Sequence, residues 1–585
     1  MSFRGRMLLV VAVAATCAIS LAQDANLQAI ECPFPEGQEV VSEEECGKYS
    51  ACEWTDGVCH VVDNAVGGYV VQGPPEVTTR GFKVNLKKAD DTVTMFGDDV
   101  TNLVFEVIQH EDYHLQVKIY DADAERYEVP VPLSLPDAAD AGALYTVNVS
   151  GEGEPFDFVV SRKSNNNTVF RSLGPLTFED QFLQLHTSLA STYLYGFGEN
   201  THLSFRHTFE PRSTFPIFAR DQPVGTDPMN EYGHHPYYMV MEDDEGNSHS
   251  VLLYNSNAME YSTFLLEDGT PALTLRTIGG IIDLHMFLGP LPEDLITQYT
   301  SVSITAPHHS LSPSISPLST TLSQQSRNHN TNGTPDQDPG VWPEVGEISR
   351  YTLNIRYQYL PYLYYLFHRA HMFGNSVVRP LLNVFPSDLA ARDVDDQFMW
   401  GDGKVLIQGA TSRDVYFPKG IWYDLVTGVA TATGPTTLTV DAPLEVIPLY
   451  VPGGAILPYQ VPGLNTVESR QNPLGLTVAL DGTLAASGEI FWDDGEGEHD
   501  MSLAYMSMLN YNQNELTMSV MAGEDIVAGL FIDTINIYGF PSAPQGVSVN
   551  DMELPGEDWE YDASTSVLTI TTHAPLADPL SVFIL

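Results

Sequence analysis

Two short stretches, Val104-Phe-Glu-Val-Ile108 and Leu115-Gln-Val-Lys-Ile-Tyr120, decide the fold class of the first half of the chain. Apolar and polar residues alternate in both with a period of two, which is typical of β-strands with one buried face. Similar short runs, among them Thr274-Leu-Arg-Thr-Ile278, follow one another from residue 66 to 299 and are broken by Gly, Pro and Asp. The sequence therefore predicts one large antiparallel β-sandwich over residues 66–299.

The composition limits the classes of protein to which the chain can belong. Its 585 residues are enough for several domains. It carries 26 Lys and Arg against 76 Asp and Glu, a net charge of −50, which repels phosphate backbones and argues against nucleic-acid binding. A hydrophobic content of 43% excludes disorder throughout the chain. The 45 Gly and 39 Pro indicate many turns, as in β-rich proteins.

Residues 1–22 have the pattern of a secretory signal peptide. Arg4 and Arg6 precede an apolar run from Met7 to Ile19, and Ser20-Leu-Ala22 supplies small residues at a cleavage site. An uncleaved signal anchor is the alternative, although the run is short for a membrane span. No later stretch reaches 18 apolar residues. We expect a secreted or secretory-lumen protein with no membrane span in the mature chain.

The remaining cysteines, Cys32, Cys46, Cys52 and Cys59, lie close together in the chain. An even set in a short segment of a secreted protein predicts two disulfides, and four cysteines allow three pairings. Zinc is the weaker alternative, because the cysteine spacing is not that of a zinc site and only His60 is near. Residues 30–62 resemble a trefoil (P-type) domain, although that family normally has six cysteines.

Five motifs in a fixed order point to a known family. Together they resemble the N-terminal sandwich of glycoside hydrolase family 31, the α-glucosidases of maltase, sucrase-isomaltase and lysosomal type, which in animals carry a trefoil domain ahead of it. The motifs are Leu115-Gln-Val-Lys-Ile-Tyr-Asp121 with Arg126-Tyr-Glu-Val-Pro130, Tyr195-Gly-Phe-Gly-Glu199, Ala219-Arg-Asp221, Asn255-Ser-Asn-Ala-Met259 and Arg276-Thr-Ile-Gly-Gly280.

The resemblance implies a (β/α)8 barrel next, and here the chain departs from the family. Residues 300–325 read as a low-complexity linker, with six serines between Ser310 and Ser323 and no apolar period. The family pattern resumes at Ser326-Arg-Asn-His-Asn330. Because such a barrel needs about 250 residues, residues 326–408 can hold only a remnant of it.

The remnant contains one predicted helix, at about residues 350–373. Ser349 is its expected N-cap and Gly374 lies at its end. The expected inward face is Leu353, Tyr357, Leu360, Tyr364 and Phe367. With most of the barrel missing, we expect part of this face to be exposed.

The resemblance also implies what the chain has lost. A retaining glycosidase needs a carboxylate nucleophile and a carboxylic acid. The family places these in Trp-x-Asp-Met-Asn-Glu and Gly-Asp-Asn motifs, and neither follows Tyr299. Asp227-Pro-Met-Asn-Glu231 is interpreted as an accidental loop, and Trp492-Asp-Asp-Gly-Glu496 as structural or solvated. We therefore predict no catalytic residue in this chain.

Two pocket residues of the family have counterparts. By resemblance, Asp221 lies on a loop that reaches the sugar, and His329 donates to a hydroxyl of the same sugar. Without the family context, both would read as ordinary polar loop residues. Three sequons, at Asn148, Asn166 and Asn332, predict N-glycosylation of a secreted surface.

The last third of the chain resembles the family again and predicts two β-sandwiches, over residues 409–500 and 501–585. The whole chain is thus mainly β with a partial α/β segment. The parent activity implied is retaining hydrolysis of terminal α-linked glucose, on substrates such as maltose or starch-derived oligosaccharides, with no metal or organic cofactor. For this chain we expect no such catalysis. The alternatives are a secreted, non-catalytic carbohydrate-binding protein and an incomplete gene product of a full-length α-glucosidase.

Overall fold

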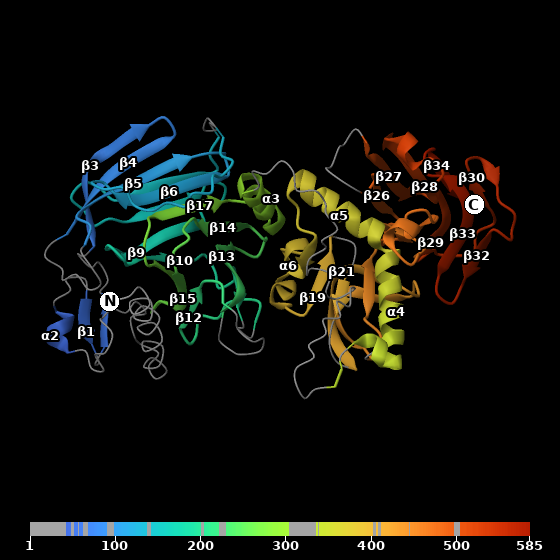
Figure 1. Ribbon diagram of the computed structural model, residues 1–585, viewed down its shortest axis with the longest axis horizontal. Helices are drawn as coiled ribbons and strands as arrows, with labels where there is room; N and C mark the ends of the chain where they lie inside the picture. The colour runs from blue at the N-terminus through green and yellow to red at the C-terminus, as the bar shows by residue number, and fades with distance from the viewer. Residues whose placement is uncertain are drawn as a thin grey trace. The chain divides into compact units, whose positions relative to one another are not determined.

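The computed structural model divides the chain into two compact units, residues 1–305 and 306–585 (Figure 1). Its described residues are 42–47, 52–55, 58–61, 68–89, 99–136, 142–200, 204–220, 230–303, 335–336, 338–401, 405–407, 411–443, 445–495 and 503–585. None of the helices in these ranges is both long and apolar enough to cross a membrane. The signal peptide predicted at residues 1–22 lies outside them.

Unit 1 contains two large antiparallel sheets. The eight-stranded sheet has the order β11 (Leu194–Asn200), β13 (Asn230–Met241), β14 (Ser248–Leu253), β17 (Ile282–Phe287), β6 (His114–Asp121), β5 (Asn102–Gln109), β4 (Gly81–Lys88) and β3 (Tyr69–Thr78). The seven-stranded sheet has the order β12 (Ser213–Ile217), β15 (Met259–Leu265), β16 (Pro271–Thr277), β10 (Leu183–Ser188), β9 (Thr168–Phe178), β8 (Phe158–Arg162) and β7 (Tyr145–Val149).

The two sheets share one hydrophobic core, as the alternating sequence pattern predicts. Along β5, Leu103, Phe105 and Val107 are buried while the residues between them are partly exposed. The ring of Phe105 lies 4.9 Å from that of Phe158 on the other sheet. The described residues of this region therefore form two antiparallel sheets on a shared core, in line with the mainly β fold that the sequence predicts. Its last element, helix α3 (Pro292–Ser303), packs Leu295 against Phe287.

Strand β11 approaches β13 so closely that only glycine fits at two positions. A Cβ on Gly196 would lie 2.5 Å from the Tyr237 carbonyl oxygen, and Gly196 has a φ of 124°. Phe197, with a φ of 68°, is held in the left-handed region between Gly196 and Gly198. The Phe197 ring stacks 3.8 Å from the Tyr261 ring in the core, so packing offsets the backbone strain.

We expect Gly196→Ala to destabilise unit 1 far more than Gly269→Ala. Gly269 also has a positive φ of 82°, but nothing lies within 4 Å of its added Cβ. Gly269→Ala should therefore lower the free energy of unfolding only by the cost of a left-handed alanine, about 1–2 kcal/mol. At Gly196 the clash of the new Cβ adds about 1–3 kcal/mol to that loss. Urea unfolding of the two variants measures the difference. Equal losses would show that β13 can move away.

The short elements near the N-terminus are helix α2 (Glu43–Cys46) and the hairpin β1 (Cys52–Thr55) and β2 (Val58–Val61). Cys46 and Cys59 form a disulfide. Of the three possible pairings, only the one that also joins Cys32 to Cys52 contains this bridge. Cys32 and the side chain of Cys52 lie outside the described residues, so that second disulfide remains a prediction.

Unit 2 contains three sheets. The first has the order β18 (Val378–Pro380), β19 (Gln397–Trp400), β20 (Val405–Ile407), β23 (Leu449–Pro452), β21 (Ser412–Asp424) and β22 (Ala430–Asp441). The second has the order β24 (Ile456–Gln460), β25 (Leu474–Ala479), β29 (Phe531–Tyr538), β33 (Val567–Pro575) and β32 (Trp559–Asp562). The third has the order β26 (Ala486–Trp492), β27 (Tyr505–Asn512), β28 (Glu515–Ala522), β34 (Leu580–Ile584), β30 (Val547–Val549) and β31 (Met552–Glu553).

The second and third sheets enclose one core and form a C-terminal sandwich. Strands β25 and β29 pair in parallel, and the other strand pairs of unit 2 described here are antiparallel. Strands β18 to β20 of the first sheet lie in the part of the chain predicted to be the barrel remnant, and they pair antiparallel. The short helices α6 (Leu381–Val384) and α7 (Thr466–Ser469) join strands of these sheets.

The single helix predicted at about 350–373 is wrong in its beginning, and its predicted face is right in part, since Leu360, Tyr364 and Phe367 pack against the core. Helix α4 (Pro343–Gln358) begins before Ser349, which is buried within it, and α5 (Leu360–Phe373) follows after a break at Tyr359. Pro361 causes the break, because proline cannot donate the helical hydrogen bond. The predicted end is confirmed, since Gly374 caps α5 in the left-handed conformation.

The most buried side chains of the second helix differ from the predicted ones. Along α5 the buried residues are Pro361, Tyr362, Leu363, Tyr365, Leu366 and His368. Of the five residues predicted to face inward, Leu353 is exposed and the other four are partly buried. Trp342 and Phe373, at the outer ends of the two helices, are also exposed. The expected exposure of apolar side chains on these helices is therefore confirmed, although at partly different residues.

Candidate functional site

The two predicted sugar ligands, Asp221 and His329, lie outside the described residues. What the structure describes is the base of the loop that carries Asp221. The Arg220 backbone N–H donates to the Glu231 carbonyl oxygen at 2.9 Å, so the described residues on either side of 221–229 lie next to each other. Residues 227–229 of the string Asp227-Pro-Met-Asn-Glu231 lie outside the described residues as well.

A second contact fixes the base of this loop. The Gly233 backbone N–H donates to Glu199 Oε2 at 2.7 Å. Glu199 follows the left-handed segment of β11, and a Cβ on Gly198 would come within 2.8 Å of His234 Cα. The residues of the motif Tyr195–Glu199 therefore hold the first part of β13 close to β11.

Two further residues at the loop base were not singled out in the sequence. Tyr232, near the start of β13, is 57% exposed. Glu231 Oε1 is enclosed and has no hydrogen-bond partner, so a ligand hydroxyl donating to it would remove a desolvation cost. The sequence signal was available, because both residues directly follow the loop that contains Asp221.

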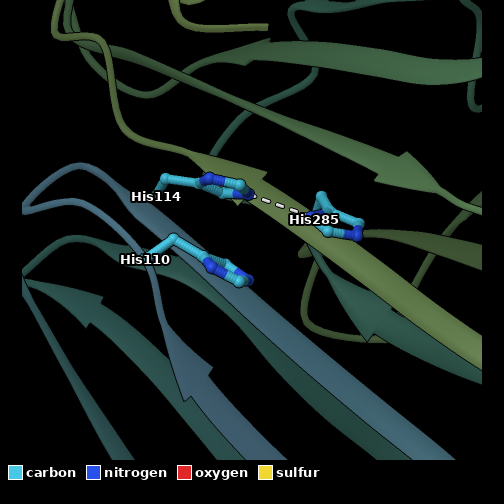
Figure 2. A group of neighbouring side chains, drawn as sticks. All are labelled: His110, His114 and His285. Atoms are coloured by element: carbon cyan, nitrogen blue, oxygen red, sulfur yellow. Dashed lines mark hydrogen bonds between the residues drawn. The ribbon is translucent and has the colours of Figure 1, made fainter. Parts of the chain in front are cut away.

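Among the described residues, three histidines come closest to a metal centre. His110, His114 and His285 are buried, and one nitrogen atom from each lies within 4.8 Å of the others. Figure 2 shows the His110 and His114 rings side by side, with His285 beyond them. The sequence indicates no metal site, because no Cys/His cluster is visible along the chain. The spacing of His110 and His114 was a signal, but β17 supplies the third ring from 171 residues further along the chain.

The hydrogen bonds of the first ring occupy both of its nitrogens. Arg80 can only donate, so His110 Nδ1 accepts from Arg80 Nη2 at 2.5 Å. The His110 proton is then on Nε2, which donates to Gln116 Oε1 at 2.9 Å. The Gln116 side-chain amide in turn donates a hydrogen bond to Asp283 Oδ1 at 2.8 Å. A metal on His110 would have to displace either a guanidinium or this amide.

The other two rings complete the chain of hydrogen bonds. His285 Nε2 lies 3.5 Å from Asp283 Oδ1, which favours a proton on that nitrogen. His285 Nδ1 then accepts from His114 Nε2 at 2.9 Å (Figure 2). Only His114 Nδ1 has no partner. The three histidines, Gln116 and Asp283 therefore form one hydrogen-bond network that joins β6 to β17. Most of the imidazole lone pairs that could bind a metal already accept hydrogen bonds in this network.

Burial sets the protonation of this network. It lowers the pKa of His114 well below the ordinary value and that of His285 to about 3. It also lowers the pKa of His110. Burial raises the pKa of Asp283 to about 7, although the Gln116 hydrogen bond opposes that rise. Near neutral pH the three imidazoles are uncharged.

These shifts predict that unit 1 loses stability as the pH falls below about 6.5, the ordinary histidine pKa. Below this pH, His110 and His114 bind protons in the unfolded chain but stay unprotonated in the folded chain, because their pKa values are lowered there. The lowered pKa of His285 and the raised pKa of Asp283 act in opposite directions and largely cancel. Each suppressed protonation lowers the free energy of unfolding by about 1.4 kcal/mol per pH unit. Urea unfolding between neutral and mildly acidic pH measures the slope.

His114→Gln is the matched variant for this prediction. It removes one of the suppressed protonations, so its stability should fall less steeply with decreasing pH than that of the parent. A stability that does not change over this pH range in the parent would contradict the role assigned to the buried histidines.

Asp493, in the string Trp492-Asp-Asp-Gly-Glu496, is held by hydrogen bonds from its neighbours. The Tyr364 hydroxyl lies 3.0 and 2.9 Å from the two Asp493 carboxylate oxygens. The Gly495 backbone N–H donates to Asp493 Oδ1 at 2.8 Å, and the Arg470 guanidinium lies 4.1 Å from the Trp492 ring centroid. Asp493 thus ties helix α5 to strand β26, which agrees with the structural role predicted for this string.

Of the predicted sequons, two lie in described residues. Asn148 is exposed on β7, and Asn166 is exposed in the turn between β8 and β9. Asn332 lies outside the described residues. Both described asparagines are therefore accessible for glycosylation.

Comparison with protein families gives two matches. Residues 320–366 match the description "Glycosyl hydrolases family 31 TIM-barrel domain", and residues 374–457 match "Glycosyl hydrolase family 31 C-terminal domain". The barrel match is short, and it ends within the region of helices α4 and α5.

The relatives extend over most of the chain. Intestinal sucrase-isomaltase of Oryctolagus cuniculus is 24% identical over 821 residues, covering 88% of this chain and 44% of that protein. Lysosomal alpha-glucosidase of Mus musculus is 23% identical over 809 residues, covering 84% of this chain and 83% of that protein. The chain thus spans less than half the length of the intestinal relatives that it matches.

A solved structure supports the fold. The glucosidase II alpha subunit has a TM-score of 0.71 with this chain, at 12% identity, and the match covers 89% of this chain and 97% of that one. At that identity the likeness concerns the fold alone.

Proposed function

Because this chain belongs to glycoside hydrolase family 31, we propose that it derives from a retaining α-glucosidase and keeps a sugar-recognition loop but not the catalytic carboxylates. The parent reaction is hydrolysis of terminal α-linked glucose. The chain as it stands would recognise such sugars weakly and would not hydrolyse them.

One observation carries this proposal. Since 88% of 585 residues is about 515, roughly 300 of the 821 positions aligned with the rabbit relative have no residue in this chain. A (β/α)8 barrel typically takes about 250 residues. The barrel family matches only residues 320–366. The missing positions therefore correspond in size to most of a catalytic barrel.

The chemistry follows from that loss. Retention requires two carboxyl groups roughly 5–5.5 Å apart, one of which attacks the sugar. The family strings that would supply them are absent from the sequence after Tyr299. What remains are groups suited to binding: Asp221 and His329 by resemblance, and Tyr232 and Glu231 at the base of the Asp221 loop.

Titration with maltose, followed by ligand-observed NMR, tests the recognition. We expect weak binding that Asp221→Ala removes and that Asp268→Ala, an exposed turn carboxylate of the same unit, leaves unchanged. If the parent chain shows no binding, or both variants bind equally well, the loop has no part in recognition.

A second candidate is an incomplete gene product of a full-length enzyme. The Ser- and Pro-rich tract from Ala306 to Gln325, between two regions that match the family, favours it. Sequencing of transcripts across codons 295–335 decides between the candidates. A transcript that restores a barrel-sized insertion there would make the complete protein an ordinary α-glucosidase.

The remaining parts of the proposal concern location and partners. The signal peptide at residues 1–22, the trefoil-like segment 30–62 and the sequons support a secreted or secretory-lumen glycoprotein. Its ligands would be α-glucosides such as maltose or starch-derived oligosaccharides. The proposed recognition involves no metal or organic cofactor.

A further inference from the structure

Strand β7 is an edge strand, and no described strand pairs with its second side. Among the described strands it pairs only with β8, at the end of the seven-stranded sheet. Leu144 O accepts from Lys163 N at 2.8 Å, and Ser150 N donates to Asp157 O at 2.9 Å. Antiparallel ladders alternate, so Thr146 and Asn148 bond toward β8. The backbone groups of the residues between them, including Val147, point to the open side.

The other edge strands of the unit 1 sandwich contain prolines or irregularities that hinder pairing with a further strand. Strand β3 contains Pro74 and Pro75 at an irregularity in its pairing, and β12 contains Pro216. Strand β11 is interrupted by the left-handed Gly196 and Gly198. Prolines and bulges of this kind make an edge unsuitable for pairing with another chain.

Strand β7 has none of these devices. Its sequence, Tyr-Thr-Val-Asn-Val, contains no proline, no glycine and no charge, and it is rich in residues that favour strands. An uncharged, regular edge of this composition is a site where identical chains add to one another. Its distinguishing feature is the sequon formed by Asn148, Val149 and Ser150.

We propose that an N-linked glycan on Asn148 protects the open edge of β7 against pairing with another chain. The Asn148 side chain is exposed while Tyr145 of the same strand is buried, so it points away from the core. An added strand would lie about 4.8 Å from β7. The Asn148 side chain stands on the outer face of the sheet, so a branched glycan attached there reaches over the adjacent edge and hinders the approach of an added strand.

The inference rests on passage through the secretory pathway, which is itself part of the proposed function, but not on sugar recognition. Occupancy is measured first. The full chain is secreted from eukaryotic cells, and its peptides are mapped by mass spectrometry before and after enzymatic removal of N-glycans. We expect a glycan on Asn148 in essentially all of the secreted monomer. An unmodified Asn148 in that monomer would overturn the proposal.

The protective role is tested with matched variants. Asn148→Gln removes the β7 glycan, and Thr168→Val removes the sequon of Asn166 in the β8–β9 turn while keeping the left-handed Asn166. On size-exclusion chromatography at increasing concentration, we expect Asn148→Gln to lose the monomer peak to higher oligomers. Thr168→Val should elute as the parent does. Equal behaviour of the two variants, whether both stay monomeric or both aggregate, would overturn the edge-specific role.

Two further measurements keep the test decisive if Asn148→Gln is not secreted. In the Thr168→Val variant, the sequon of Asn148 is the one that remains among the described residues. The folded variant is treated with an enzyme that removes N-glycans, and it should then lose its monomer peak. Asn148→Lys places a charge on the same edge, which is the common protection of unglycosylated strands, and should restore the monomer without a glycan. A deglycosylated protein that stays monomeric would overturn the proposal.

Discussion

The purified chain is expected to release no glucose above the uncatalysed background from maltose or an aryl α-glucoside. General acid–base catalysis typically contributes about 10²–10⁴-fold, and covalent catalysis needs a positioned nucleophile. The proposal leaves this chain without either family carboxylate, so the groups that remain would only hold the sugar. Glucose release, measured over hours with a coupled assay, checks this expectation.

Asp227→Asn is the control for this prediction. If turnover were found, the Asp227–Glu231 string would be its first source, and the variant should abolish it. Turnover that persisted in Asp227→Asn would mean that other carboxylates act and that the account of the missing pair is wrong. A chimera that carries the missing barrel segment of a relative should, by contrast, gain activity.

Glu242→Gln is expected to destabilise unit 1 by about 3–5 kcal/mol, the usual cost of removing one partner of a buried ion pair. Arg162 donates to both Glu242 oxygens, at 2.5 and 3.0 Å, and His249 lies 3.1 Å away. Burial alone would raise the pKa of Glu242, but hydrogen bonds from His249 and Arg162 lower it to about 2. The variant leaves the Arg162 guanidinium buried without its counter-charge.

The matched control makes the same change at an exposed pair. Glu128 lies 2.6 Å from Lys118 and is about half exposed, so Glu128→Gln should cost no more than about 1 kcal/mol. Urea unfolding of the two variants gives the comparison. A loss of less than 1 kcal/mol for Glu242→Gln would show that water reaches Arg162. Because the pKa is depressed, the contribution of Glu242 persists above about pH 4.5 and is lost as the pH falls toward 2.

The β-sandwich of unit 1 could be predicted because its signal is local. Each strand of an antiparallel sheet with one buried face alternates in its own sequence, as β5 does around Phe105. The end of helix α5 was also readable, since Gly374 takes the left-handed conformation that favours glycine. The beginning of α4 and the break at Tyr359 were missed because Pro361 was not weighed against a continuous apolar pattern.

From the sequence, candidate site residues could be predicted only where they lie in a recognisable short motif. Asp221 and the sequons came from short strings, whereas Tyr232 and the unpartnered Glu231 oxygen emerge from exposure and burial at the loop base. The histidine network could not be read from the chain, because His285 meets His114 across 171 residues. Similarly, Tyr364 meets Asp493 across 129 residues.

By itself, the sequence determined the class of the sandwich, the acidic charge, the likeness to the family and the loss of its catalytic strings, because these depend on residue types and on spacing along the chain. The tertiary structure alone decided which strands end each sheet, which polar groups are buried together and which faces stay exposed. Those properties depend on contacts between residues that are distant in the chain, and a local pattern cannot specify its partner. The edge at β7 is an example, since Tyr145–Val149 reads as an ordinary strand until the sheet order leaves one of its sides open.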